Sequence, residues 1–104
     1  MDISKLEAIL AAGTDTALLR FTLGSAHAGQ KQYAQAVPHL ARAVELDPEY
    51  SAAWKLYARS LMESGDHERA GRILEQGLDV ARRRGDMQAV REMQVWQRRL
   101  QKQL

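Results

Sequence analysis

The chain resembles itself when it is shifted by about 34 residues. The shift keeps seven positions in the same size class, placing Leu23 on Tyr57, Gly24 on Ala58, Ala36 on Ala70, Leu40 on Leu74, Ala43 on Gly77, Val44 on Leu78 and Leu46 on Val80. A fixed period of this length, with small residues at set places, indicates a helical repeat array. Such arrays expose extended surfaces that bind other chains. The period therefore predicts a binding protein and not an enzyme.

The composition is that of one folded domain. Of 104 residues, 45% are hydrophobic and 27% are charged, which is ordinary for a globular protein. The net charge of +2 is small for a chain that holds nucleic acid. The chain has no cysteine, which is compatible with a reducing compartment. Because the first residues, MDISKLEAILAAG, contain no sustained apolar run, we expect no secretion signal, no membrane contact and a cytoplasmic location.

Apolar residues recur at spacings of three and four along the whole chain, which is the pattern of amphipathic helices. The sequence predicts an all-α fold of six helices, at about 3–12, 16–28, 32–46, 49–63, 67–83 and 86–104, with Thr14 or Asp15 capping the second. Because the connections are only a few residues long, neighbouring helices must pack as antiparallel hairpins.

Residues 17–84 resemble two tetratricopeptide repeats. The matching positions are Leu23, Gly24, Tyr33, Ala36, Leu40, Ala43 and the run Leu46-Asp47-Pro48 in the first repeat, and Trp54, Ala58, Gly65, Ala70, Leu74 and Leu78 in the second. The resemblance implies a single domain, residues 1–104, built as a short right-handed superhelix of stacked hairpins. It divides the domain into an N-terminal capping helix (1–13), repeat 1 (17–50), repeat 2 (51–84) and a C-terminal capping helix (85–104). The small residues of the pattern are expected to let paired helices approach closely.

A third copy of the repeat begins after Gly85 but does not continue. Arg91 and Glu92 occupy the places of the large apolar residue and the small residue. A carboxylate in a tight helix crossing would carry a heavy desolvation cost. We therefore expect the last helix to cap the stack, with five apolar side chains turned inward: Met87, Val90, Met93, Trp96 and Leu100.

The sequence contains no motif of an enzyme and calls for no cofactor. It has no glycine-rich phosphate loop, no glycine-flanked serine nucleophile and no paired-histidine metal motif. The three histidines are too irregularly spaced for a metal site on one helix. We expect His27 to pack at a helix interface, and His39 and His67 to be solvated.

The family resemblance implies a groove that binds a segment of a partner protein. In this family the first helix of each repeat lines a concave surface, which implies one stripe of ligand-facing residues per repeat: Leu18, Phe21, Ser25 and Ala28, then Ala52, Lys55, Arg59 and Met62. Lys55 and Arg59 lie one turn apart and are expected to pair with a carboxylate of a bound peptide, which arginine can do bidentately. Phe21 and Met62 are expected to receive an apolar side chain. The sequence thus predicts a non-enzymatic protein-interaction adaptor.

Two alternatives remain open. The first is self-association, in which the array ends or the groove pair two copies as a homodimer. The second, less favoured, is RNA binding through a C-terminal basic patch made of Arg82, Arg83, Arg84, Arg98, Arg99 and Lys102. The simpler, structural explanation of the run Arg82-Arg83-Arg84 is that cations at a helix C-terminus complement the helix dipole.

Overall fold

The computed structural model describes residues 2–103, and all of its regular structure is helical. Six helices follow one another along the chain: α1 (Ile3–Ala11), α2 (Ala17–Gly29), α3 (Tyr33–Leu46), α4 (Ser51–Glu63), α5 (His67–Arg84) and α6 (Met87–Gln103). The all-α fold expected from the sequence is confirmed, and each helix lies within two residues of its expected start.

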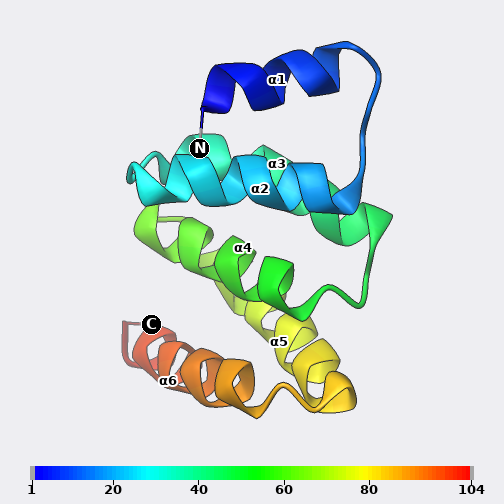
Figure 1. Cartoon of the computed structure of the whole chain (residues 1–104). Coiled ribbons are helices and arrows are strands. Elements are labelled where there is room, and N and C mark those ends of the chain that lie inside the picture. The colour runs from blue at the N-terminus through cyan, green and yellow to red at the C-terminus, as the bar shows by residue number, and fades with distance from the viewer. Residues whose placement is uncertain (1, 104) are drawn as a thin grey trace.

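The helices stack into an elongated array of two layers, with extents of 42 × 28 × 19 Å. In Figure 1, α2, α4 and α6 lie one below another at the front, while α3 and α5 lie behind them. Each helix from α1 to α5 packs against the next one in the chain, and α4 also contacts both α2 and α6. The layer formed by α2, α4 and α6 therefore presents one continuous face.

Side-chain caps fix where several helices begin. The hydroxyl oxygen of Thr16 accepts a hydrogen bond from the backbone N–H of Leu19 at 3.1 Å, and Asp66 caps α5 in the same way. Thr16 thus replaces the expected cap at Thr14 or Asp15. Asp15 is instead engaged by the Arg20 guanidinium, whose Nε lies 2.7 Å from the carboxylate.

Four helix exits contain a residue with positive φ: Gly13 after α1, Lys31 after α2, Gly65 after α4 and Gly85 after α5. Gly85 follows α5 with φ of 72°, a conformation that glycine adopts without steric cost. After α2, the left-handed residue is Lys31, with φ of 60°, and not Gly29. This uncommon conformation for a lysine aims the chain from α2 into α3.

The repeat's small residues sit where helices cross, as the sequence predicts. A Cβ atom built on Gly24 would lie 2.6 Å from Cγ of the fully buried Leu40 in α3. A Cβ atom on Gly77 would lie 3.0 Å from the sulfur of Met93 and 3.2 Å from Cβ of Trp54. Larger side chains at Gly24 and Gly77 would therefore not fit between the neighbouring helices at their present separation.

Helix α1 is attached by a small cluster of its own. Leu6 packs with Leu19 and Leu23 of α2, separately from the main core that spans α3 to α6. Of the other helices, only α2 is packed against α1. The N-terminal end of the stack is therefore held by much less apolar contact than its centre.

Helix α6 lies at the end of the stack and buries three of the five side chains expected to turn inward, Val90, Met93 and Leu100. Met87 is 52% exposed and Trp96 is only half-buried, whereas Ala89, Val90, Met93 and Leu100 are buried. The buried positions of α6 follow those of α4 by 36 residues, so that Met93 takes the place of Tyr57. The cause lies in α5, which has 18 residues where α3 has 14, followed by a shorter turn. Glu92 thereby leaves the helix crossing and reaches solvent.

Candidate functional site

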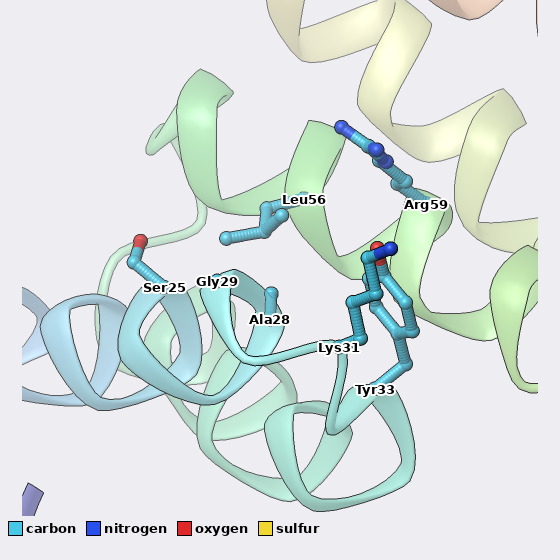
Figure 2. A pocket seen from close by; sticks show the side chains of 7 residues that line it. All are labelled: Ser25, Ala28, Gly29, Lys31, Tyr33, Leu56 and Arg59. Carbon is cyan, nitrogen blue, oxygen red and sulfur yellow. The ribbon is translucent and has the colours of Figure 1, made fainter.

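An open pocket of about 430 Å³ lies between the C-terminal half of α2 and the facing side of α4. Its lining comes from α2, from the turn that follows it, and from α3 and α4, and consists of Ser25, Ala28, Gly29, Lys31, Tyr33, Leu56 and Arg59. Figure 2 shows Leu56 and Arg59 of α4 above the end of α2, with Lys31 and Tyr33 rising beside them. The pocket combines an apolar floor with cationic and hydroxyl groups, which is the usual make-up of a binding site.

The turn between α2 and α3 fixes the basic side of the pocket. The backbone N–H of Lys31 donates to the carbonyl of Ala28 at 2.9 Å, and that of Gln32 donates to the carbonyl of His27 at 2.9 Å. The side chain of Gln32 also accepts a hydrogen bond from Nδ1 of the buried His27, at 2.9 Å. These bonds hold Lys31 in its left-handed conformation beside the mouth of the pocket.

The two cations of the pocket have no acidic partner among residues 2–103. No carboxylate of the described residues lies within 4.0 Å of Lys31 or Arg59. Arg20, Arg42, Lys55, Arg72 and Arg83, by contrast, all pair with carboxylates. The pocket therefore carries positive charge that the described part of the chain does not neutralise.

The structure brings together three of the eight residues expected in the groove, and the other five lie outside the pocket. Ser25, Ala28 and Arg59 line the same pocket. Lys55 lies outside it, and its Nζ is 3.5 Å from Oε2 of Glu92 in α6. That Lys55 and Arg59 pair with a carboxylate of a bound peptide stays a prediction, and the structure adds that Lys55 already has an acidic partner within the chain.

The apolar members of the expected stripe are mostly used in packing. The ring of Phe21 lies 4.9 Å from that of Tyr50, centroid to centroid, and Met62 is half-buried against the main core. Ala52 is exposed near the start of α4. Leu18 is 66% exposed and lies one turn before Phe21, outside the pocket. Whether these side chains also contact a ligand stays a prediction.

Four residues that line the pocket lie outside the stripe expected from the sequence: Gly29, Lys31, Tyr33 and Leu56. Leu56 is half-buried and lines the pocket. Tyr33 is a position of the family pattern, whereas Lys31 belongs neither to that pattern nor to the expected stripe. The one signal that pointed to Lys31 was its place in a short turn after Gly29, directly beside the expected groove helix.

The C-terminal basic residues do not form one patch. Arg82 and Arg84 end α5, whereas Arg98, Arg99 and Lys102 lie near the far end of α6. At a rise of about 1.5 Å per residue, Arg98 lies roughly 18 Å along α6 from the turn at Asp86. Arg83 is paired with both Glu49 and Asp79. The single basic surface considered for RNA is therefore absent from the described residues.

His39 also differs from the expectation, because it is half-buried between α2 and α3 instead of solvated. Its Nδ1 lies 3.1 Å from Nη1 of Arg20, and its ring stacks on that of His27 with centroids 5.7 Å apart. Burial, followed by the charge of Arg20 and of His27, lowers the pKa of His39 below 6.5, against opposing effects of Glu7 and Asp15. No group of three or more acidic or histidine residues suited to a metal ion occurs within residues 2–103.

Comparison with known proteins agrees with this architecture. The family model for the tetratricopeptide repeat matches residues 27–93. The chain is also 46% identical over 100 residues to the TPR repeat-containing protein PA0015 of Pseudomonas aeruginosa, an alignment that covers 96% of this chain and 95% of that one. The chain therefore belongs to the tetratricopeptide repeat family, whose members are generally non-enzymatic protein-interaction modules. None of the helices described is long and apolar enough to span a membrane.

Two solved structures share the fold. The solution structure of protein BPP2914 from Bordetella parapertussis is 47% identical, with a TM-score of 0.82, over 99% of this chain and 90% of that one. A tetratricopeptide repeat domain protein of Salinibacter ruber, at 21% identity, matches with a TM-score of 0.74 over 84% of this chain and 97% of that one.

Proposed function

We propose that the chain is an adaptor that captures an extended segment of a partner protein, holding a carboxylate of that segment in the pocket between α2 and α4. The observation that carries the proposal is the pair of cations, Lys31 and Arg59, which face an open pocket without an acidic partner among residues 2–103. The family's general role in protein interactions supports the same class of function.

The chemistry of the lining suits such a ligand. Arg59 presents a planar fork of donors that can hold a carboxylate bidentately, and Lys31 adds a second positive charge. Leu56 and Ala28 offer apolar surface to a neighbouring side chain of the peptide. The walls come from packed helices and a hydrogen-bonded turn, so little ordering is needed on binding and less affinity is lost.

We further propose that the binding unit is made of repeat 1 (17–50) and repeat 2 (51–84), with 1–13 and 85–104 as caps. The cytoplasm remains the location expected from the sequence.

Self-association is the second candidate function. Two large apolar side chains are exposed toward the N-terminal end of the stack, Ile9 at 46% and Leu18 at 66%. If they pair two copies, sedimentation velocity over a range of protein concentrations will show a dimer, and Leu18→Glu will return it to a monomer. A monomer at high micromolar concentration would leave the adaptor as the remaining candidate.

The test of the adaptor uses the peptide acetyl-Ala-Leu-Asp-Ala-Asp, prepared with a free C-terminus and as the amide. Removing the charge-assisted bonds of Arg59 by Arg59→Glu is expected to weaken binding at least about tenfold, measured by calorimetry. Lys31→Glu is expected to act in the same direction. The matched control is Arg91→Glu, the same charge change at an exposed site on α6.

If Arg59→Glu and Arg91→Glu lower the peptide affinity equally, the attraction is a non-specific effect of charge. That result would reject the pocket as the binding site. The two peptide forms separate the sources of the carboxylate. If only the free acid binds, the ligand group is a chain terminus. If both forms bind, a side-chain carboxylate is sufficient.

A further inference from the structure

The ion pair between Lys55 and Glu92 crosses the groove face from α4 to α6, with 3.5 Å between Nζ and Oε2. We propose that Glu92 is a built-in competitor for acidic ligands. It neutralises Lys55 and thereby confines the partner's carboxylate to the pocket at Lys31 and Arg59. This inference rests on the proposed function, since it concerns how that same groove selects its ligand.

Lys55 is placed to form a second acidic subsite if Glu92 is absent. Lys55 and Arg59 lie four residues apart on α4, so their Cβ atoms are about 5–6 Å apart on one helix face. In an extended peptide, alternate residues lie roughly 6.6 Å apart. Two carboxylates separated by one residue would therefore match Lys55 and Arg59 together.

The pair has the character of a removable contact and not of a structural bridge. The side chains of Lys55 and Glu92 are 30% and 38% exposed. Solvent-exposed pairs of this kind add little stability, because water screens the attraction and two long side chains must be held in place. A ligand carboxylate can displace Glu92 from Lys55. The displacement breaks the Lys55–Glu92 pair and brings the ligand carboxylate close to that of Glu92, which repels it. The groove therefore favours peptides with a single acidic group.

The packing of α6 explains how a glutamate reaches this position. With a repeat of 34 residues, Glu92 would stand at the tight crossing occupied by Gly24 and Ala58 in the two repeats. The offset of 36 residues between α4 and α6 puts Met93 into the core instead and leaves Glu92 partly exposed, facing α4. The longer α5 thus shifts the register of α6 and places Glu92 at the groove face, within reach of Lys55.

The experiment compares Glu92→Gln with the control Glu75→Gln, which makes the same charge change on exposed α5 surface where no ion pair is formed within residues 2–103. The probes are the amidated peptide acetyl-Ala-Leu-Asp-Ala-Asp and its two single-acid analogues, with one aspartate replaced by asparagine. Glu92→Gln is expected to strengthen binding of the two-acid peptide about two- to fivefold, the range of an exposed ion pair. Binding of the single-acid peptides is expected to change much less. In a Lys55→Gln background, Glu92→Gln is expected to give no gain.

The inference is overturned if wild-type protein binds the peptides through Arg59 but Glu92→Gln gives no selective gain. It is also overturned if Glu75→Gln gives the same gain, or if the gain persists without Lys55. If the peptides do not bind wild-type protein in an Arg59-dependent way, the proposed function itself fails, and the competitor role fails with it. Thermal unfolding of each variant checks that folding is retained, and an unfolded Glu92→Gln protein would show a structural role and reject the inference.

Discussion

Gly24 of α2 lies directly against the side chain of Leu40 in α3, so closely that a single added carbon would stand 2.6 Å from Leu40 Cγ. Leu40 is fully buried, so an added carbon at Gly24 would press on a side chain of the core. The separation of the two layers at repeat 1 therefore depends on the absence of a side chain at one position.

This contact predicts opposite effects for two glycine-to-alanine changes. Gly24→Ala is expected to lower the free energy of unfolding by about 1–3 kcal/mol, because it overpacks the crossing. Gly71→Ala is the control: it lies inside α5 with no atom within 4 Å of the added Cβ, and it is expected to raise that free energy by about 0.5–1 kcal/mol. Urea denaturation at fixed pH measures both. A Gly24→Ala protein as stable as wild type would contradict the crossing.

The hydrogen bond between Arg20 and His39 makes stability depend on pH. Arginine can only donate, so Nδ1 of His39 must accept and the ring must be neutral, with its proton on Nε2. The pKa of His39 in the folded chain lies below the ordinary 6.5, chiefly because of burial. As the pH falls, the unfolded chain takes up the proton first. The free energy of unfolding is therefore expected to be highest above about pH 6.5 and to decline as the pH drops through the lowered pKa.

Urea midpoints measured between pH 8 and pH 5 test this dependence. His39→Gln should flatten the decline, whereas His67→Gln, which removes an exposed histidine of α5, should leave it in place. The carboxylate of Asp15 does not confuse this window, because its hydrogen bond from Arg20 holds its pKa below 3.8 and its protonation comes at lower pH. An equally steep decline in His39→Gln would assign the pH dependence to another group.

The separate cluster under α1 predicts that this helix can open alone. Leu6→Ala truncates the buried side chain of α1 and is expected to weaken the attachment of α1 to α2 by about 2–5 kcal/mol, the usual cost of Leu→Ala in a packed core. The main core does not include Leu6, so α3 to α6 should stay folded. Native-state hydrogen exchange should show the α1 amides losing protection while those of α4 and α5 keep theirs. Uniform loss across all helices would mean that α1 belongs to the cooperative core.

The pairing of Lys55 predicts that the two groove cations are not equivalent. Because Lys55 is engaged by Glu92, Lys55→Gln is expected to change binding of a single-acid peptide less than twofold, whereas Arg59→Gln should weaken it about tenfold or more. Calorimetric titrations of the two variants at the same salt concentration measure the difference. Equal losses would restore Lys55 as a direct ligand contact.

The sequence was sufficient for the helices and for the crossings, because both follow from local patterns. Apolar spacing and turn residues mark each helix, and the small residues at Gly24 and Gly77 mark each close approach. The two-residue departure of α6 from the 34-residue period was not predictable in this way. It depends on the combined length of α5 and the following turn, and a change of two residues there rotates every side chain of α6.

The candidate site was predictable only in part for a related reason. Family spacing correctly brought Ser25, Ala28 and Arg59 together, because they are set by the regular packing of α2 and α4. Lys31 depends on a left-handed residue in a turn, and the state of Lys55 depends on a glutamate 37 positions later in the chain. Neither relationship leaves a periodic signal in the sequence.

The most direct test of the account is a ¹⁵N–¹H NMR titration with amidated acetyl-Ala-Leu-Asp-Ala-Asp. If a carboxylate binds between α2 and α4, saturable shifts are expected on the amides of residues 25–33 and 56–59, which surround the pocket. These shifts are expected to disappear in Arg59→Glu. Shifts confined to the opposite layer, α3 and α5, or the same shifts in Arg59→Glu, would contradict the account.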